Sequence, residues 1–269
     1  MPIITGDLMD TPSEANFLKV KDFIDFLQDK SGIDPVVLLG NHDMREDGFM
    51  RSMPGWAADI PVTRMFWHDE STVGISCFNS ARSGDLTKGK IGTAEFDEMG
   101  TQLDKNAKKA SEYTLLAALH HHPIPVEKPE WYLRSRMILA GSSHFILALM
   151  QYQESWYERL LGKNFDQTGI LEDSEHFLRW CEQRKVKAVM HGHKHIPRCT
   201  KHNGLTVIGC GSTVGKVKTQ IDYETFISLN IITVDTSNRK LNCRLLAERV
   251  PGGGLELTET HEIILSNSI

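Results

Sequence analysis

Residues 35–43 read Pro-Val-Val-Leu-Leu-Gly-Asn-His-Asp. Their apolar half is short and rich in branched side chains, which is typical of a buried strand, and the polar half follows where that strand ends. Apolar residues recur at helical spacing over residues 13–30, and Ile3-Ile4-Thr5 before them has the character of another strand end. A strand, a helix and a second strand with polar residues at the strand ends indicate an α/β fold.

Three further segments repeat this pattern of an apolar run that ends in polar side chains. They are Gly6-Asp7-Leu8-Met9-Asp10, His120-His121-His122-Pro123 and Gly192-His193-Lys194-His195. Together with Gly40-Asn41-His42-Asp43 they bring Asp, Asn and His to strand ends. Oxygen and imidazole donors in such a set are the ligands that a borderline divalent metal prefers.

The remaining chain alternates between helical and strand-like patterns without a change of composition that would mark a domain boundary. Helices are predicted at 13–30, 95–110 and 175–184, and the segment 124–171 is rich in aromatic residues, Met and Leu. Strands are predicted at 72–78, 113–119, 186–190, 205–209, 226–234, 241–248 and 263–265. We therefore expect one domain over residues 1–269, with two β-sheets face to face and helices outside.

Bulk properties limit the classes of protein. The chain has 269 residues, 40% of them hydrophobic and 24% charged, which is ordinary for a globular protein. Its net charge of −5 gives no reason to expect a nucleic-acid partner, and no apolar run approaches the roughly 20 residues of a membrane span. The five cysteines are scattered, without Cys-x-x-Cys. That pattern favours reduced thiols and a cytoplasmic setting.

Taken in order, the four polar segments resemble the calcineurin-like metallophosphoesterase family. Its pattern is Asp-x-His, Gly-Asp-x-x-Asp, Gly-Asn-His-Asp/Glu, a lone His and Gly-His-x-His. The resemblance extends from about Ile3 to Thr213 and implies a four-layer sandwich of two sheets flanked by helices. It also implies two divalent metal ions (Mn, Fe, Zn or Co), which lower the pKa of a bridging water and clamp the phosphoryl oxygens.

The same resemblance assigns roles to individual residues. Asp7 would bridge the two metals and His195 would serve the second one. The first metal would be completed by Asn41, His121 and His193.

Catalytic roles follow in the same way. His42 would stabilise the transition state or protonate the leaving oxygen, with Asp10 as its partner and Asp43 as a weaker candidate. His122 would touch substrate or pack beside Pro123. His120 would point to the opposite side and be structural.

One motif is absent, because no Asp-x-His lies ahead of Asp7. The second metal would keep only Asp7 and His195, and the fold would lack its first strand. Truncation of a longer protein is the favoured explanation, and a true variant with one metal or none is the alternative.

Two functions follow from these expectations. The first is hydrolysis of a small phosphomonoester or phosphodiester, of cyclic-nucleotide or glycerophosphodiester type, by a metal-bridging hydroxide. The alternative is a non-catalytic binding or scaffold protein that retains the fold with a degenerate metal site. Metal content would separate them. The patterns leave the oligomeric state open.

Overall fold

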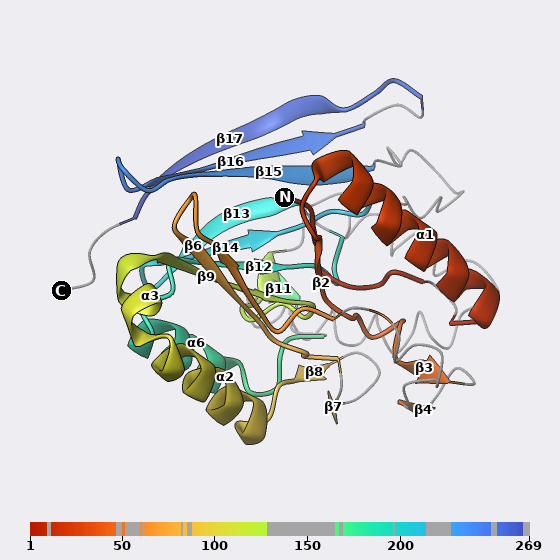
Figure 1. The fold of residues 1–269 in the computed structure, drawn as a ribbon. Helices are drawn as coiled ribbons and strands as arrows, with labels where there is room; N and C mark the ends of the chain where they lie inside the picture. The colour runs from red at the N-terminus through yellow and green to blue at the C-terminus, as the bar shows by residue number, and fades with distance from the viewer. Residues whose placement is uncertain are drawn as a thin grey trace.

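Parallel strands with buried, continuously apolar sequences form the centre of the fold. The computed structural model describes residues 1–9, 12–46, 50–51, 60, 62–81, 83–84, 88–127, 165–166, 169–195, 197–213, 227–248 and 252–265. Its largest sheet has the strand order β13-β14-β12-β9-β6-β5. The inner strands β14, β12, β9 and β6 are parallel, and the outer strands β13 and β5 run antiparallel to their neighbours (Figure 1). The bounds of these strands are β5 Met65–His68, β6 Val73–Cys77, β9 Thr114–Leu119, β12 Ala188–His191, β13 Arg198–His202 and β14 Leu205–Gly209.

A second layer of strands packs against one face of this sheet. β15 (Ser228–Asp235), β16 (Lys240–Ala247) and β17 (Glu256–Ile264) form an antiparallel sheet. β1 (Ile3–Ile4) and β2 (Val36–Val37) form a parallel pair. Alternate residues of β16 are buried, as expected for a strand with one covered face. One hydrophobic cluster joins β2, β16 and the six-stranded sheet, so the two layers share a core.

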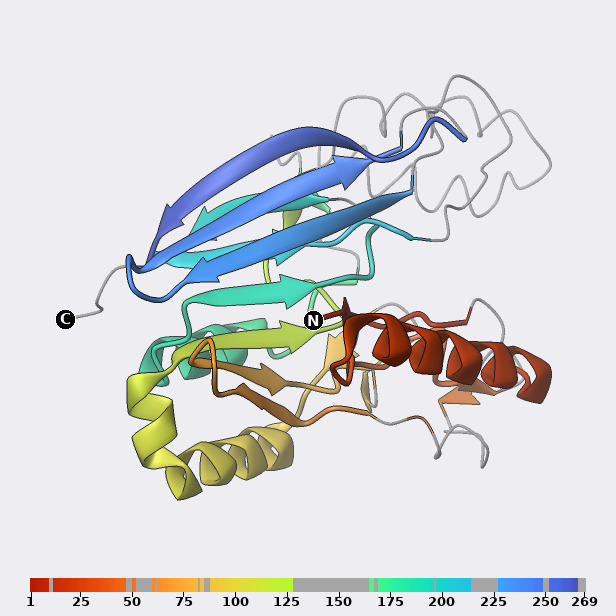
Figure 2. The ribbon, with the colours of Figure 1, turned by 45° about the horizontal axis from the view of Figure 1, so that its top comes forward.

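Helices cover the other face of the six-stranded sheet. α2 (Thr93–Lys105), α3 (Ala107–Glu112) and α6 (Ser174–Gln183) lie there, and α2 and α6 bury apolar side chains against β9 and β12 (Figure 2). Phe78, directly after β6, is fully buried at the centre of this contact. Its ring meets the rings of Phe177 and Trp180 edge-on, at centroid distances of 5.3 and 4.9 Å.

α1 (Glu14–Ser31) closes the opposite side of the molecule. The Ser13 side chain caps its first turn by accepting the Asn16 N–H at 3.2 Å. Gly32 ends the helix in the left-handed conformation, at φ 67°, which glycine adopts without strain. The buried side of α1 packs on Val37 and Leu39. The four layers are therefore α1, the strands β1, β2 and β15–β17, the six-stranded sheet, and the helices α2, α3 and α6. The predicted α/β fold with two facing sheets is confirmed.

The predicted helices and longer strands match the observed ones, with the following differences. The helix expected at 95–110 is interrupted at Asn106, which ends α2 and precedes α3. β5 and β13 were not predicted, because these sheet-edge strands are only four and five residues long and show no alternation of apolar and polar residues. β17 is longer than the strand expected at 263–265. Most of the segment 124–171 lies outside the described residues.

Short two-stranded pieces complete the described structure. They pair β3 (Arg45–Glu46) with β4 (Met50–Arg51), β7 (Ser83–Gly84) with β8 (Gly89–Lys90), and β10 (Val126–Glu127) with β11 (Phe165–Asp166). Among the described helices, none combines the length and the apolar character needed to cross a membrane.

Candidate metal centre

Polar residues from distant parts of the chain meet where four strands end. Asp7 follows β1, Asn41 follows β2, His120 follows β9 and His193 follows β12. β1 runs parallel to β2, and β9 runs parallel to β12. The carboxyl ends of parallel strands lie at the same edge of a sheet, where loops converge on one place. The fold therefore gathers these four side chains.

The donor atoms of this group lie at short distances from one another. Asn41 Oδ1 is 3.0 Å from His120 Nε2 and 3.1 Å from His193 Nδ1. His120 Nε2 is 3.3 Å from His193 Nδ1 and 3.4 Å from Asp7 Oδ1. Two donors bonded to one ion at about 2.1 Å are roughly 3.0 Å apart at right angles and roughly 3.4 Å apart at tetrahedral angles. The separations among Asn41, His120 and His193 are those of ligands around a single small cation, and the Asp7 carboxylate adjoins His120.

Hydrogen bonding fixes the tautomer of His120. Its Nδ1 is 2.7 Å from the carbonyl oxygen of Thr5, which can only accept, so Nδ1 carries the proton. Burial lowers the pKa of His120, although the Asp7 carboxylate partly opposes this effect. The ring is therefore neutral, and Nε2 directs a lone pair at the oxygens of Asn41 and Asp7. A metal-binding histidine is usually held in this way, by a backbone carbonyl on its other nitrogen.

His121 has a different hydrogen-bond arrangement. Ser80 Oγ accepts the backbone N–H groups of His120 and His121 at 3.2 and 3.1 Å, and it lies 3.0 Å from His121 Nδ1. With both lone pairs engaged, the Ser80 hydroxyl donates to Nδ1 and leaves the proton of the neutral ring on Nε2. His121 still belongs to the cluster, since one nitrogen each of His120, His121 and His193 lie within 4.8 Å of one another.

One expectation about orientation was wrong. His120 does not point away from the site, because the Thr5 carbonyl turns its ring toward Asn41. His193 and His195 do not lie on an extended chain, since both have left-handed backbone, at φ 70° and 56°. Alternation of side chains therefore does not apply to this loop.

The backbone of the centre is strained at three of the predicted residues. Asp7, at φ 56°, joins His193 and His195 among the non-glycine residues with positive φ. Such conformations persist where the surrounding structure holds them, commonly at functional sites. The Asp7 carboxylate and the His120 ring lie so close to the backbone of residue 40 that only glycine fits there, because a Cβ would overlap both groups.

Asp43 ties two of the loops together. Its carboxylate oxygens accept the backbone N–H groups of Met9, at 2.9 Å, and Gly40, at 2.8 Å. Burial raises the pKa of Asp43 to about 7, and the charge of Asp7 adds to this rise while the Gly40 and Met9 N–H groups oppose it. Asp43 therefore positions the backbone of both loops. This role differs from the one predicted for it, in which Asp43 was the weaker candidate for the partner of His42.

The other predicted site residues lie around this centre. The backbone N–H of His42 donates to Asp7 Oδ1 at 3.0 Å, and the side chain is partly exposed. Asp10 lies outside the described residues. His195 is partly exposed on the loop after β12. His122 is completely buried, with its ring 5.9 Å from that of His193.

Burial keeps the histidines of the centre neutral. It lowers the pKa of His193 well below its ordinary value, and the neighbouring His120 and His121 add to this effect. Burial also lowers the pKa of His191, the last residue of β12, to about 4. A neutral imidazole is the form that binds a metal, so the electrostatics of this interior suit a cation ligand set.

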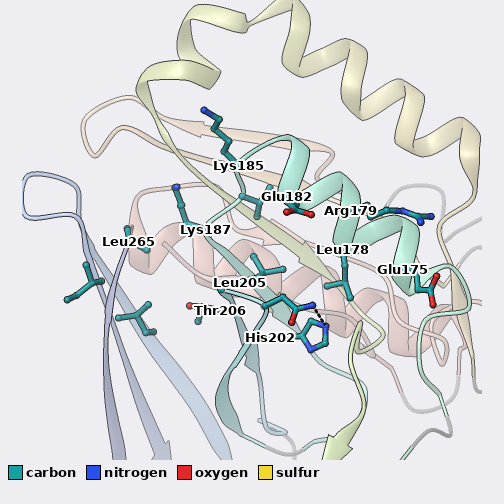
Figure 3. A pocket seen from close by; sticks show the side chains of 15 residues that line it. Glu175, Leu178, Arg179, Glu182, Lys185, Lys187, His202, Leu205, Thr206 and Leu265 are labelled. Atoms are coloured by element: carbon teal, nitrogen blue, oxygen red, sulfur yellow. Dashed lines mark hydrogen bonds between the residues drawn. The ribbon is translucent and has the colours of Figure 1, made fainter. Parts of the chain in front are cut away.

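A cavity of about 560 Å³ lies elsewhere and is not part of this centre. It is lined by one side of α6, the turn between β13 and β14, and the end of β17 (Figure 3). Lys187 and Leu205 line it just before β12 and at the start of β14. It therefore lies at the amino ends of these parallel strands, whereas the metal centre lies at their carboxyl ends.

The family is established by comparison with known proteins. A family model described as calcineurin-like phosphoesterase matches residues 3–197, which is more than half of the chain. The chain therefore belongs to the calcineurin-like phosphoesterase family, a class of metal-dependent phosphoesterases. A comparison with curated protein sequences found no significant match.

Solved structures with some similarity are remote. A mutant Vps29 from Entamoeba histolytica is 17% identical over 35% of this chain and 48% of its own, with a TM-score of 0.26. GAP50 of Plasmodium, an anchor in the inner membrane complex, is 10% identical over 72% and 50%, with a TM-score of 0.38.

A protein from Staphylococcus aureus described as a 5′-nucleotidase is 11% identical over 99% of this chain and 45% of its own, with a TM-score of 0.39. This chain thus spans about half the length of these proteins. Similarity of this degree adds nothing to the family assignment.

Proposed function

We propose that this protein hydrolyses a small phosphomonoester or phosphodiester with the help of a divalent metal at the Asp7–Asn41–His120–His193 centre. The observation that carries the proposal is the set of separations of 3.0–3.3 Å among the donor atoms of Asn41, His120 and His193, with the Asp7 carboxylate 3.4 Å from His120 Nε2. A divalent ion held there would lower the pKa of a water and offset charge on the phosphoryl oxygens.

Hydrogen bonding supports His120 as a ligand in place of His121. The Thr5 carbonyl keeps the proton of His120 on Nδ1 and leaves Nε2 available, whereas Ser80 engages Nδ1 of His121 and leaves its proton on Nε2. The family pattern alone favoured His121, because a sequence pattern records where a histidine stands in the chain and not which of its ring nitrogens carries the proton.

The remaining roles rest on the resemblance and on position. His42 adjoins Asn41 in the chain, so we assign it to the leaving oxygen, with Asp10 as the predicted partner. His195 is proposed as a ligand of a second metal that shares Asp7. The role predicted for His122 in substrate binding stays a prediction, and its complete burial offers the alternative of supporting His193.

The types of donor atom indicate which metals suit the two sites. Mixed imidazole, amide and carboxylate ligands suit Mn, Fe, Zn or Co, and the first centre has four donors while the second has two recognised ones. We therefore propose that one ion binds more tightly than the other.

The five cysteines are all free thiols, which supports a cytoplasmic setting.

Metal analysis and a phosphoesterase assay test the proposal together. The purified chain is loaded with Mn²⁺, its bound metal is counted by mass spectrometry, and hydrolysis of aryl phosphate monoesters and diesters is measured. We expect His120→Ala to lose more than the roughly 10–100-fold in metal affinity that loss of a supporting group costs. Asn41→Ala should behave alike, and His121→Ala should retain the metal.

His202→Ala is the matched control, because this residue is the last of β13, at the end of the sheet that lies away from the metal centre. If His120→Ala bound Mn²⁺ like the control, the assignment of the centre would be wrong. If the unaltered chain bound no metal and hydrolysed neither ester, the non-catalytic binding protein would be the better description.

A further inference from the structure

The three-stranded sheet ends in a long edge strand. Its strand order is β15-β16-β17, and within the described part of the chain β17 is hydrogen-bonded to β16 alone. Figures 1 and 2 show β17 as the outermost strand of this sheet. It has nine residues, whereas the edge strands β5 and β13 have four and five. An edge strand presents a row of backbone N–H and C=O groups with which a further strand can pair.

β17 carries few of the features that protect an edge strand from pairing. Proline and lysine are two such features, and neither occurs in Glu256–Ile264. A bulge is a third, and β17 has one at Thr258, where its register against β16 shifts between Leu245 and Leu246. The bulge lies near the start of the strand, and residues 259–264 keep a regular register with β16. The edge is therefore open to pairing over most of its length.

The most exposed large apolar side chains lie at the two ends of this strand. Ile264 is 69% exposed and Leu257 is 58% exposed, more than any other large apolar residue among those described. Their cross-strand partners alternate with the buried residues of β16, so both side chains face outward. Thr260 is the midpoint of the strand. A second β17, antiparallel about this midpoint, would bring Leu257 of each copy beside Ile264 of the other.

The charged residues of β17 are complementary to their own antiparallel copy. A two-fold axis at Thr260 places Glu259 opposite His261 of the second copy. These two side chains already contact each other within one chain, with His261 Nε2 2.9 Å from Glu259 Oε2. Opposite residues of an antiparallel pair lie on the same face of the sheet, so two glutamates and two histidines would alternate across the axis.

The positions of the glutamates select this register. An axis at Glu259 or Glu262 would place that glutamate directly opposite its own copy, and like charges in this position are destabilising. An axis at His261 would place Glu259 opposite Ile263, which offers no opposite charge. With the axis at Thr260, no glutamate of β17 faces another. The strand is thus self-complementary about its middle residue.

We propose that this chain forms a symmetric dimer in which β17 pairs antiparallel with β17 of a second copy about Thr260. The two three-stranded sheets then become one continuous sheet, and each copy contributes the same surface. A single strand edge buries less than the roughly 800 Å² per partner of a standard interface. The dimer should therefore exchange with the monomer at micromolar concentrations.

The second copy would lie beside the cavity at the amino ends of the parallel strands. Ile263, Ile264 and Leu265 form the β17 side of the lining of this cavity. Glu256 of the second copy lies opposite Ile264 in the proposed register, so its strand would begin at the rim of the cavity. The inference depends only on β17 and stands whether or not the proposed hydrolysis is confirmed.

Sedimentation equilibrium of the full chain tests the dimer. From about 1 to about 100 µM, the average mass should rise from the 30.4 kDa of one chain toward twice that value. Thr260→Lys should weaken the dimer at least about tenfold, because it places two ammonium groups together at the axis. Thr233→Lys is the matched control, since Thr233 is an exposed threonine of β15, at the other edge of the same sheet. It should leave the equilibrium unchanged.

A cysteine at the axis tests the register. Facing residues of an antiparallel pair have Cα atoms about 4.5–5.5 Å apart, which a disulfide can span. Mild oxidation should therefore link two Thr260→Cys chains, whereas Thr233→Cys chains should stay unlinked. A chain that is monomeric at about 100 µM, a dimer that Thr260→Lys leaves intact, or equal linking of the two cysteine variants would each overturn the proposal. The cysteine variant decides the register even if Thr260→Lys fails to fold.

Discussion

Asp43 offers a quantitative test of how the loops of the metal centre are held. Replacing Asp43 by Asn keeps its size and removes its ionisation. In the metal-free protein, burial raises the pKa of this carboxyl from 3.8 to about 7. Each pH unit of such a shift corresponds to about 1.4 kcal/mol, so the full shift amounts to on the order of 4 kcal/mol.

The sign follows from the protons bound in each state. Between about pH 4 and pH 7 the folded protein keeps the Asp43 proton and the unfolded chain releases it, so the free energy of unfolding falls as the pH rises. The stabilisation is complete below about pH 4 and is lost by about pH 7. The buried histidines have lowered pKa values and act in the opposite direction, but they are present in both proteins and cancel in the difference.

The assay is urea unfolding in EDTA, followed by tryptophan fluorescence at a series of pH values, for the unaltered chain and Asp43→Asn. The quantity compared is the free energy of unfolding of the unaltered chain minus that of Asp43→Asn. This difference should fall by on the order of 4 kcal/mol from about pH 4 to pH 7 and stay constant above pH 7. An effect of the substituted amide on stability that does not depend on pH leaves this pH dependence unchanged. Parallel curves for the two proteins would refute the reasoning, because they would show that Asp43 ionises normally. Mn²⁺ bound beside Asp7 should reduce the slope, since the cation favours the ionised carboxylate.

Three further substitutions test the fold and the centre. Phe78→Ala should lower the free energy of unfolding by roughly 3–5 kcal/mol in urea, because it empties a fully buried ring site; a loss below about 1 kcal/mol would contradict this packing. Ser13→Ala should cost about 1 kcal/mol through loss of the α1 cap, with bound Mn²⁺ unchanged as the check. Gly40→Ala should abolish stoichiometric Mn²⁺ binding, since its Cβ overlaps Asp7. Gly100→Ala, whose Cβ would meet only a flexible arginine, is the control that should bind metal normally.

Much of the fold could be predicted because its local patterns agree with its tertiary structure. The run before Gly40 is apolar enough to be buried on both faces, and the capping residues Ser13 and Gly32 mark the ends of α1. The edge strands β5 and β13 were missed for the opposite reason. An edge strand is covered on fewer sides, so its residues need not alternate or be apolar, and its pairing partner alone makes it a strand.

The sequence by itself determined which residue types reach the strand ends, and in this way it determined the family and indicated Asp7, Asn41 and His193 as members of the proposed metal centre. Only the tertiary structure gives a reason to propose His120 in place of His121. Adjacent histidines are equivalent in a motif, and only the Thr5 carbonyl, directly after β1 and more than a hundred positions away, orients the ring and places its proton.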